Sequence, residues 1–194
     1  PGNVISALTY VTTGLFVASL ASAGLTSLKR GEYSGRPRVS FVAVVALIFI
    51  LIVSVTAEYF TIQRYSAYIA FQKGVAAANA NNVDLAEAKI TKAASLSSND
   101  LFYRALTEIG MIKINVLLQT PAEDTTADAI RAKFQNVLGN TLNSANEAIA
   151  IDPTNYSNHV TRGRVYELIV PLKIEGAYAA AKATYDEALK VNPH

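Results

Sequence analysis

The chain has no cysteine and no tryptophan, and few of its residues are charged. The lack of cysteine among 194 residues excludes disulfide bonds, thiolate metal sites and cysteine nucleophiles. Charged residues make up 16 % of the chain, whereas about a quarter is usual in soluble domains. Hydrophobic residues make up 51 %. A chain that combines so little charge with so many hydrophobic residues is expected to hold a membrane segment.

The sequence also lacks the motifs of common catalytic sites. It contains no glycine-rich phosphate loop, no Gly-x-Ser-x-Gly elbow and no His-Glu-x-x-His pair. A zinc site needs three or four converging ligands, and Glu167, two turns after His159, completes no such set. His194 is the other histidine and stands at the last position. We expect no catalytic residue, no metal and no cofactor within this chain, and the sequence does not decide whether a complete protein would be an enzyme.

Two long runs near the start of the chain carry no charge, at residues 3–28 and 39–57. About 20 apolar residues suffice for a helix to cross a bilayer. The first run is the less apolar one, and it contains Gly14 and Gly24, small residues that let helices approach closely. A signal peptide or a buried soluble helix is the alternative for that run, but it has no basic start and a second run follows. The sequence predicts transmembrane helices at about 3–28 and 39–58.

A short basic loop, residues 29–38, joins the two runs and holds four cations and one anion. The loop therefore carries a larger positive charge than the whole chain, whose formal net charge is +2. The positive excess of the chain lies in this loop. Short basic loops stay on the cytoplasmic side of a membrane. We therefore expect residues 1–60 to form a hairpin in a bacterial inner membrane and residues 58–194 to lie outside the cytoplasm. A nucleic-acid patch is the competing interpretation, which the flanking apolar runs disfavour, so the expected surroundings are a lipid bilayer and no nucleic acid.

Two segments about 40 residues apart repeat one pattern. Residues 145–153 read Ala-Asn-Glu-Ala-Ile-Ala-Ile-Asp-Pro, and residues 185–193 read Tyr-Asp-Glu-Ala-Leu-Lys-Val-Asn-Pro. Each is the second half of a helix that runs into a proline, which cannot continue a helix. Helix-forming residues dominate from Glu58 onward. Repetition of this kind indicates stacked helical hairpins.

The register of these segments resembles the tetratricopeptide repeat, a pair of helices in about 34 residues with small residues at tight contacts and a late proline. The resemblance covers three copies, at about 67–100, 101–155 and 156–194, and a generic alanine-rich bundle is the alternative. It implies an all-α fold, in which the transmembrane hairpin precedes a short α-solenoid of about three helix pairs at residues 61–194. The residues that carry the resemblance, expected at packing contacts, are Gly74, Ala86, Ala93, Gly110, Ala148, Pro153, Gly163, Tyr166, Ala181, Tyr185, Ala188 and Pro193.

Three connections between helices are expected in the repeats. The asparagine-rich segment 79–82 suits a tight turn. In the irregular second copy, where Thr141 occupies a position at which alanine is usual, a loop at 119–124 should precede a long helix that Asp124 or Thr125 caps. About six inserted residues, 171–176, should lie in the turn of the third copy.

The resemblance also implies a binding face. In this family the first helix of each pair lines a concave groove that takes a protein or peptide. Its inward positions here are apolar at first and include two arginines further along, which suit a carboxylate of a peptide or an acidic glycan. The alternative is that these side chains pack against neighbouring hairpins. The candidate groove residues are Tyr68, Phe71, Arg104, Thr107, Arg164 and Glu167, with Met111 and Ile114 at equivalent positions.

The layout of a membrane hairpin, a basic loop and an outer repeat array resembles the C-terminal part of bacterial O-antigen ligase or polymerase-like membrane proteins with a tetratricopeptide tail. In that family glycan transfer takes place in the membrane part and its large periplasmic loop, and this sequence contains no such loop. The start at Pro1 and the end just after a helix suggest a piece of a longer chain. Two functions are therefore expected: a membrane-anchored scaffold for a protein partner or, alternatively, the docking tail of a glycan-transfer enzyme.

Overall fold

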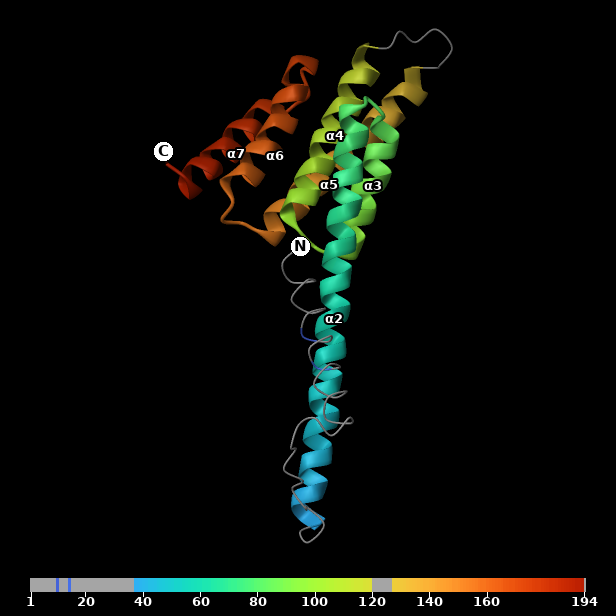
Figure 1. Ribbon diagram of the computed structural model, residues 1–194. Helices are drawn as coiled ribbons and strands as arrows, with labels where there is room; N and C mark the ends of the chain where they lie inside the picture. Colours follow the sequence, from blue (N-terminus) through green and yellow to red (C-terminus); the bar gives the residue numbers. More distant parts are fainter. Residues whose placement is uncertain (1–9, 11–13, 15–36, 120–126, 194) are drawn as a thin grey trace. The chain divides into compact units, whose positions relative to one another are not determined.

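The computed structural model describes residues 10, 14, 37–119 and 127–193 (Figure 1). Every regular element in these residues is helical, which confirms the all-α prediction for the described part of the chain. The chain divides into two units, Pro1–Tyr65 and Ser66–His194, whereas the sequence placed the division near residue 60. The first predicted transmembrane helix falls outside the described residues, apart from two isolated positions, and so does most of the basic loop.

Helix α2 spans Pro37–Asn79. Among the described residues, α2 is the one helix that is long and apolar enough to cross a membrane. An 18-residue stretch of it has a mean hydropathy of 2.2 and is 0 % buried. Within the apolar stretch the Thr56 hydroxyl donates to the carbonyl of Ile52 over 2.8 Å, so the helix itself supplies an acceptor for the polar group.

In the second unit, the end of α2 pairs with α3, Val83–Leu96, to form the first hairpin. The turn between them lies at the predicted position 79–82. Asn81 adopts a left-handed conformation with φ 56°, which asparagine tolerates better than most residues. The Asn82 side chain then caps α3 by accepting from the N–H of Leu85 over 3.1 Å.

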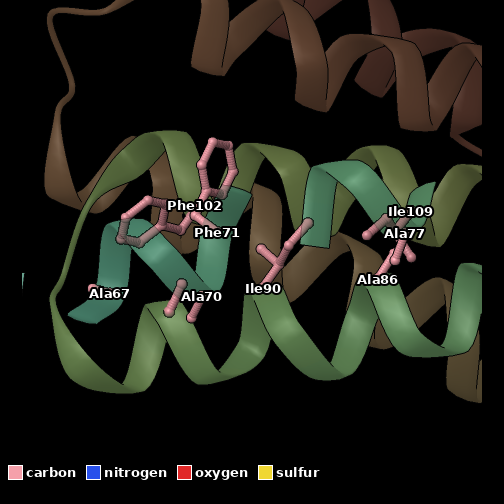
Figure 2. Close-up of a cluster of buried hydrophobic side chains, with 9 residues drawn as sticks. Ala67, Ala70, Phe71, Ala77, Ala86, Ile90, Phe102 and Ile109 are labelled. Carbon is pink, nitrogen blue, oxygen red and sulfur yellow. The ribbon is translucent and has the colours of Figure 1, made fainter. Parts of the chain in front are cut away.

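The first hairpin packs through alanines, which let the helix axes come close. Ala67, Ala86 and Ala93 are each 0 % exposed. Helix α4, Asp100–Gln119, joins this core through Phe102, whose ring lies 5.0 Å from the ring of Phe71 between centroids (Figure 2). The core of the unit therefore begins on α2 and continues into the second hairpin.

The second hairpin consists of α4 and the long helix α5, Ala127–Ile151. The predicted loop 119–124, with its proposed caps, falls almost wholly outside the described residues. The two helices meet at Gly110, where an added Cβ would overlap the side chain of Thr141. Thr141 is 2 % exposed, and its hydroxyl donates to the carbonyl of Val137 over 2.7 Å. Because residue 110 is a glycine, there is room for a threonine at position 141, where alanine is usual.

The third hairpin consists of α6, Tyr156–Ile169, and α7, Ala177–Val191. A short 3-10 helix, Val170–Leu172, lies in the connection, where insertion 171–176 was expected. The connection turns at Lys173 and Gly176, with φ 56° and 79°. An added Cβ at Gly163 would lie 2.7 Å from Cε1 of Tyr185, so this tyrosine packs within the hairpin, directly on the glycine.

Each hairpin packs against the first helix of the hairpin that follows it. Helix α4 contacts α3, α5 and α6, and helix α6 contacts α4, α5 and α7. Most of the small residues expected at packing contacts are buried, while Tyr166 is half-buried and the two helix-ending prolines are exposed. The buried alanines among them are Ala86, Ala93, Ala148, Ala181 and Ala188.

Candidate functional site

Four residues at positions predicted to line the groove are instead buried in the core. Phe71 is 8 % exposed and Thr107 is 0 % exposed. Met111 and Ile114, at equivalent positions, are also buried. Thr107 donates its hydroxyl to the carbonyl of Tyr103, so it has no donor left for a ligand. These residues pack against neighbouring helices, the alternative considered from the sequence, whereas Tyr68 is 55 % exposed.

Arg104, another predicted groove residue, belongs to a buried polar network. Its Nη1 donates to Oδ1 of Asn158 over 3.3 Å. Asn158 is 0 % exposed, and its Nδ2 lies 3.0 Å from the carbonyl oxygens of Ala148 and Asp152. The same Nδ2 lies 3.1 Å from Oδ2 of Asp100. Because these partners come from α4, α5, α6 and the α5–α6 connection, the network holds the second and third hairpins together.

The sequence carries no signal that singles out Asn158. Asparagine is mostly exposed in folded proteins, and this one belongs to no motif. Asn155 adds to the network, since its Nδ2 donates to Oδ2 of Asp100 over 2.8 Å while its Oδ1 caps α6. Both asparagines position α6 against α4.

Between α4 and α6 lies an open groove of about 480 Å³. It contains two of the predicted residues, Arg164 and Glu167. Both charged and apolar side chains line it, and they come from α4, from α6 and from the connection that follows α6. The lining residues are Glu108, Met111, Ile112, Asn115, Arg164, Glu167, Leu168 and Pro171.

The charged groups of the groove already have partners of their own. Nη1 of Arg164 lies 2.6 Å from Oε1 of Glu108, and the two side chains are 51 % and 42 % exposed. An ion pair with this exposure contributes about 0–1 kcal/mol to stability. A ligand carboxylate can therefore replace Glu108 beside Arg164 at little energetic cost.

Glu167 accepts a hydrogen bond from the hydroxyl of Tyr185 over 2.5 Å. Burial raises the pKa of Tyr185 to about 12, the hydrogen bond and charge of Glu167 act in the same direction, and Arg164 acts against them. The phenol therefore stays protonated at neutral pH and remains a donor to Glu167. This contact ties α7 to the α6 wall of the groove.

The apolar part of the groove is open to solvent at Ile112, which is 45 % exposed. Arg164 and Ile112 line the same groove. The combination of a guanidinium with apolar surface suits a polypeptide segment that carries both an acidic and an apolar side chain.

His159, considered as a metal ligand from the sequence, contacts the third hairpin and the connection that precedes it. Its Nε2 lies 3.0 Å from the carbonyl oxygen of Pro153, and its Nδ1 lies 3.6 Å from Oε2 of Glu187. Glu187 also pairs with Arg162 over 2.7 Å. Across the described residues, no three metal-ligating side chains come together.

Comparisons with known proteins yield weak structural likenesses. No protein family and no curated protein matches the sequence, so the resemblance to O-antigen ligase-like proteins gains no support. A structure titled "Arabidopsis OM64 TPR domain" is 18 % identical over 68 % of this chain and 86 % of that chain, with a TM-score of 0.49. A structure titled "Crystal structure of MamA" is 16 % identical over 66 % of this chain and 78 % of that chain, with a TM-score of 0.26. These scores are too low to support any argument about function.

Proposed function

We propose that residues 66–194 form a short tetratricopeptide-like scaffold that binds a protein partner in the groove between α4 and α6. We further propose that α2 anchors this scaffold in a membrane and that the scaffold lies outside the cytoplasm. The observation that carries the proposal is the open groove of about 480 Å³, in which an exposed ion pair lies with exposed apolar surface.

The groove favours a polypeptide segment with an acidic group. A carboxylate of the partner replaces Glu108 beside Arg164, which keeps the guanidinium paired throughout. Planar guanidinium groups bind carboxylates through two parallel hydrogen bonds. An apolar side chain of the partner covers Ile112 and removes its exposed surface from water. Neither interaction requires the buried core to rearrange.

The membrane part of the proposal rests on α2 and the loop before it. Side chains along the apolar stretch are exposed, among them Ile48 at 54 % and Leu51 at 64 %. A continuous apolar helix surface of this kind is costly in water and stable in hydrocarbon. The basic loop 29–38 supports a cytoplasmic side for the start of α2, which leads its other end outward.

Site-directed crosslinking tests the groove. A benzoylphenylalanine at Ile112 should crosslink to one partner in living bacteria, and the adduct should disappear when Arg164→Glu is added. Charge reversal at 164 places three carboxylates in the groove, which repel an acidic partner.

The matched control places the same crosslinker at Gln135, an exposed position on α5 that does not line the groove. The proposal predicts no adduct there. An adduct of equal yield at both positions would refute it, and so would one at 112 that is indifferent to Arg164→Glu.

A further inference from the structure

A second cleft lies between α3 and α5, with α4 as its floor, and it has a volume of about 540 Å³. It faces away from the α4–α6 groove. Leu106 lines the cleft and Asn115 lines the groove, and nine residues at about 100° per residue place the two on opposite sides of α4. Occupancy of one site therefore leaves the other open.

One wall of this cleft carries a row of carboxamides. Asn136, Asn140 and Asn143 line it from α5, and Glu147 continues the row. Spacings of three and four residues put these groups on one helix face, about 4.5–6 Å apart along the axis at the rise of an α-helix. Alternate residues of an extended peptide repeat every ~6.6 Å. The two four-residue spacings, at about 6 Å, come close to this repeat, and the three-residue spacing, at about 4.5 Å, is shorter.

The carboxamides have the bonding capacity that such a backbone needs. Each offers two donor hydrogens and an acceptor oxygen. Nδ2 of Asn140 donates to Oδ1 of Asn136 over 3.1 Å. That bond leaves Oδ1 of Asn140 and both Nδ2 hydrogens of Asn136 to pair with the N–H and C=O groups of a bound peptide.

The charges of the cleft are mainly negative. Its single ammonium group, Lys113, lies 2.5 Å from Oε2 of Glu87 and 3.2 Å from Oδ1 of Asp84. Burial alone would lower the pKa of Lys113, but its hydrogen bonds and attraction to these two carboxylates raise the pKa above its ordinary value. Lys113 thus serves as an internal counter-ion. Two carboxylates, Glu87 and Glu147, and one ammonium line the cleft, and Asp84 pairs with that ammonium from outside the lining. The lining therefore has a net negative charge, which attracts cations.

We infer that the cleft between α3 and α5 binds an extended polypeptide segment with basic side chains. Its backbone pairs with Asn136, Asn140 and Asn143. Its ammonium or guanidinium groups reach the carboxylates of Glu147 and Glu87, while their methylene stems lie on the apolar floor. The row of carboxamides and the net negative charge of the lining favour this occupant over a neutral glycan, which carries no cation to pair with the carboxylates.

The experiment uses the full chain in nanodiscs of phosphatidylcholine, a lipid without net charge. A fluorescein-labelled octapeptide of alternating lysine and alanine is the probe, and its anisotropy reports binding. The wild type should bind it saturably and should not bind the alternating glutamate–alanine peptide. Asn140→Ala with Asn143→Ala should weaken binding at least about tenfold, the effect of losing one or two hydrogen bonds. Glu147→Lys should do the same through charge.

Three controls make the outcome decisive. Gln135→Ala removes an exposed carboxamide from the same helix outside the cleft, and it should leave binding unchanged. Arg164→Glu alters only the α4–α6 groove and should also leave it unchanged, so the two sites can fail separately. Circular dichroism should show the same helix content in all variants. The inference is overturned if the lysine peptide does not bind, if the asparagine variants bind it like the wild type, or if chitotriose displaces it.

Discussion

Asn158 on α6 donates a hydrogen bond from Nδ2 to Oδ2 of Asp100, the first residue of α4, over 3.1 Å. The amide is fully buried, and it also reaches two main-chain carbonyls and the guanidinium of Arg104. These hydrogen bonds of Asn158 hold α6 beside α4, and those two helices form the walls of the groove. The position of the proposed binding site therefore depends on a residue that does not line it.

Replacing Asn158 by leucine, which has a similar volume, should lower the free energy of unfolding by about 2–3 kcal/mol. The substitution leaves buried polar partners without a hydrogen bond, at about 1–3 kcal/mol for each such group. Urea unfolding followed by circular dichroism measures the change. Gln135→Leu, at an exposed site on α5, should shift the value by less than about 0.5 kcal/mol. Equal effects of the two substitutions would show that the network does not stabilise the stacking.

The contact between Gly110 and Thr141 predicts that Gly110→Ala lowers the free energy of unfolding in the wild type and raises it when Thr141 is replaced by glycine. Gly110→Ala should destabilise the protein by about 1–3 kcal/mol, because the new methyl overlaps Thr141. In a Thr141→Gly background the same substitution should stabilise it by up to about 1 kcal/mol, since alanine has the higher helix propensity. Thermal or urea unfolding of the four proteins yields the coupling. Additive effects would contradict the close approach of α4 and α5.

Tyr185 predicts a loss of stability at high pH. Its folded-state pKa of about 12 lies above the ordinary value of 10, so the folded state keeps this proton longer than the unfolded state does. Its contribution is fully present below pH 10 and disappears as the pH rises through about 12. The stability difference between the wild type and Tyr185→Phe should shrink across that window in urea titrations.

Glu167→Gln is the companion variant for Tyr185. It removes the charge that helps raise the phenol pKa while an amide oxygen remains as acceptor. The pH window for Tyr185 should therefore move downward. An unchanged window in Glu167→Gln would show that the carboxylate does not act on the phenol.

Much of the repeat architecture was accessible from sequence because it depends on local signals. Backbone chemistry alone marks several helix boundaries: the asparagine-rich turn at 79–82, the insertion at 171–176 and the prolines after α5 and α7. Glycines 110 and 163 were expected at packing contacts, and an added Cβ at either one would overlap a side chain of the facing helix, Thr141 or Tyr185.

The candidate site was less accessible, because burial depends on contacts between hairpins. Phe71 and Thr107 occupy positions that face a groove in regular arrays, but here neighbouring helices cover them. Arg104 was predicted to line the groove, and its guanidinium donates a hydrogen bond to Asn158. Helical periodicity places a residue on a face, and only the stacking of hairpins decides what covers that face.

Cysteine labelling tests most directly the claim that α2 anchors an extracytoplasmic helical unit. Because the chain has no cysteine, Ser34→Cys in the basic loop and Lys133→Cys on α5 each supply a single thiol. In intact bacteria, a membrane-impermeant maleimide should label position 133 and should reach position 34 only after the membrane is permeabilised. Labelling of position 34 in intact cells, or protection of position 133 until permeabilisation, would contradict the account.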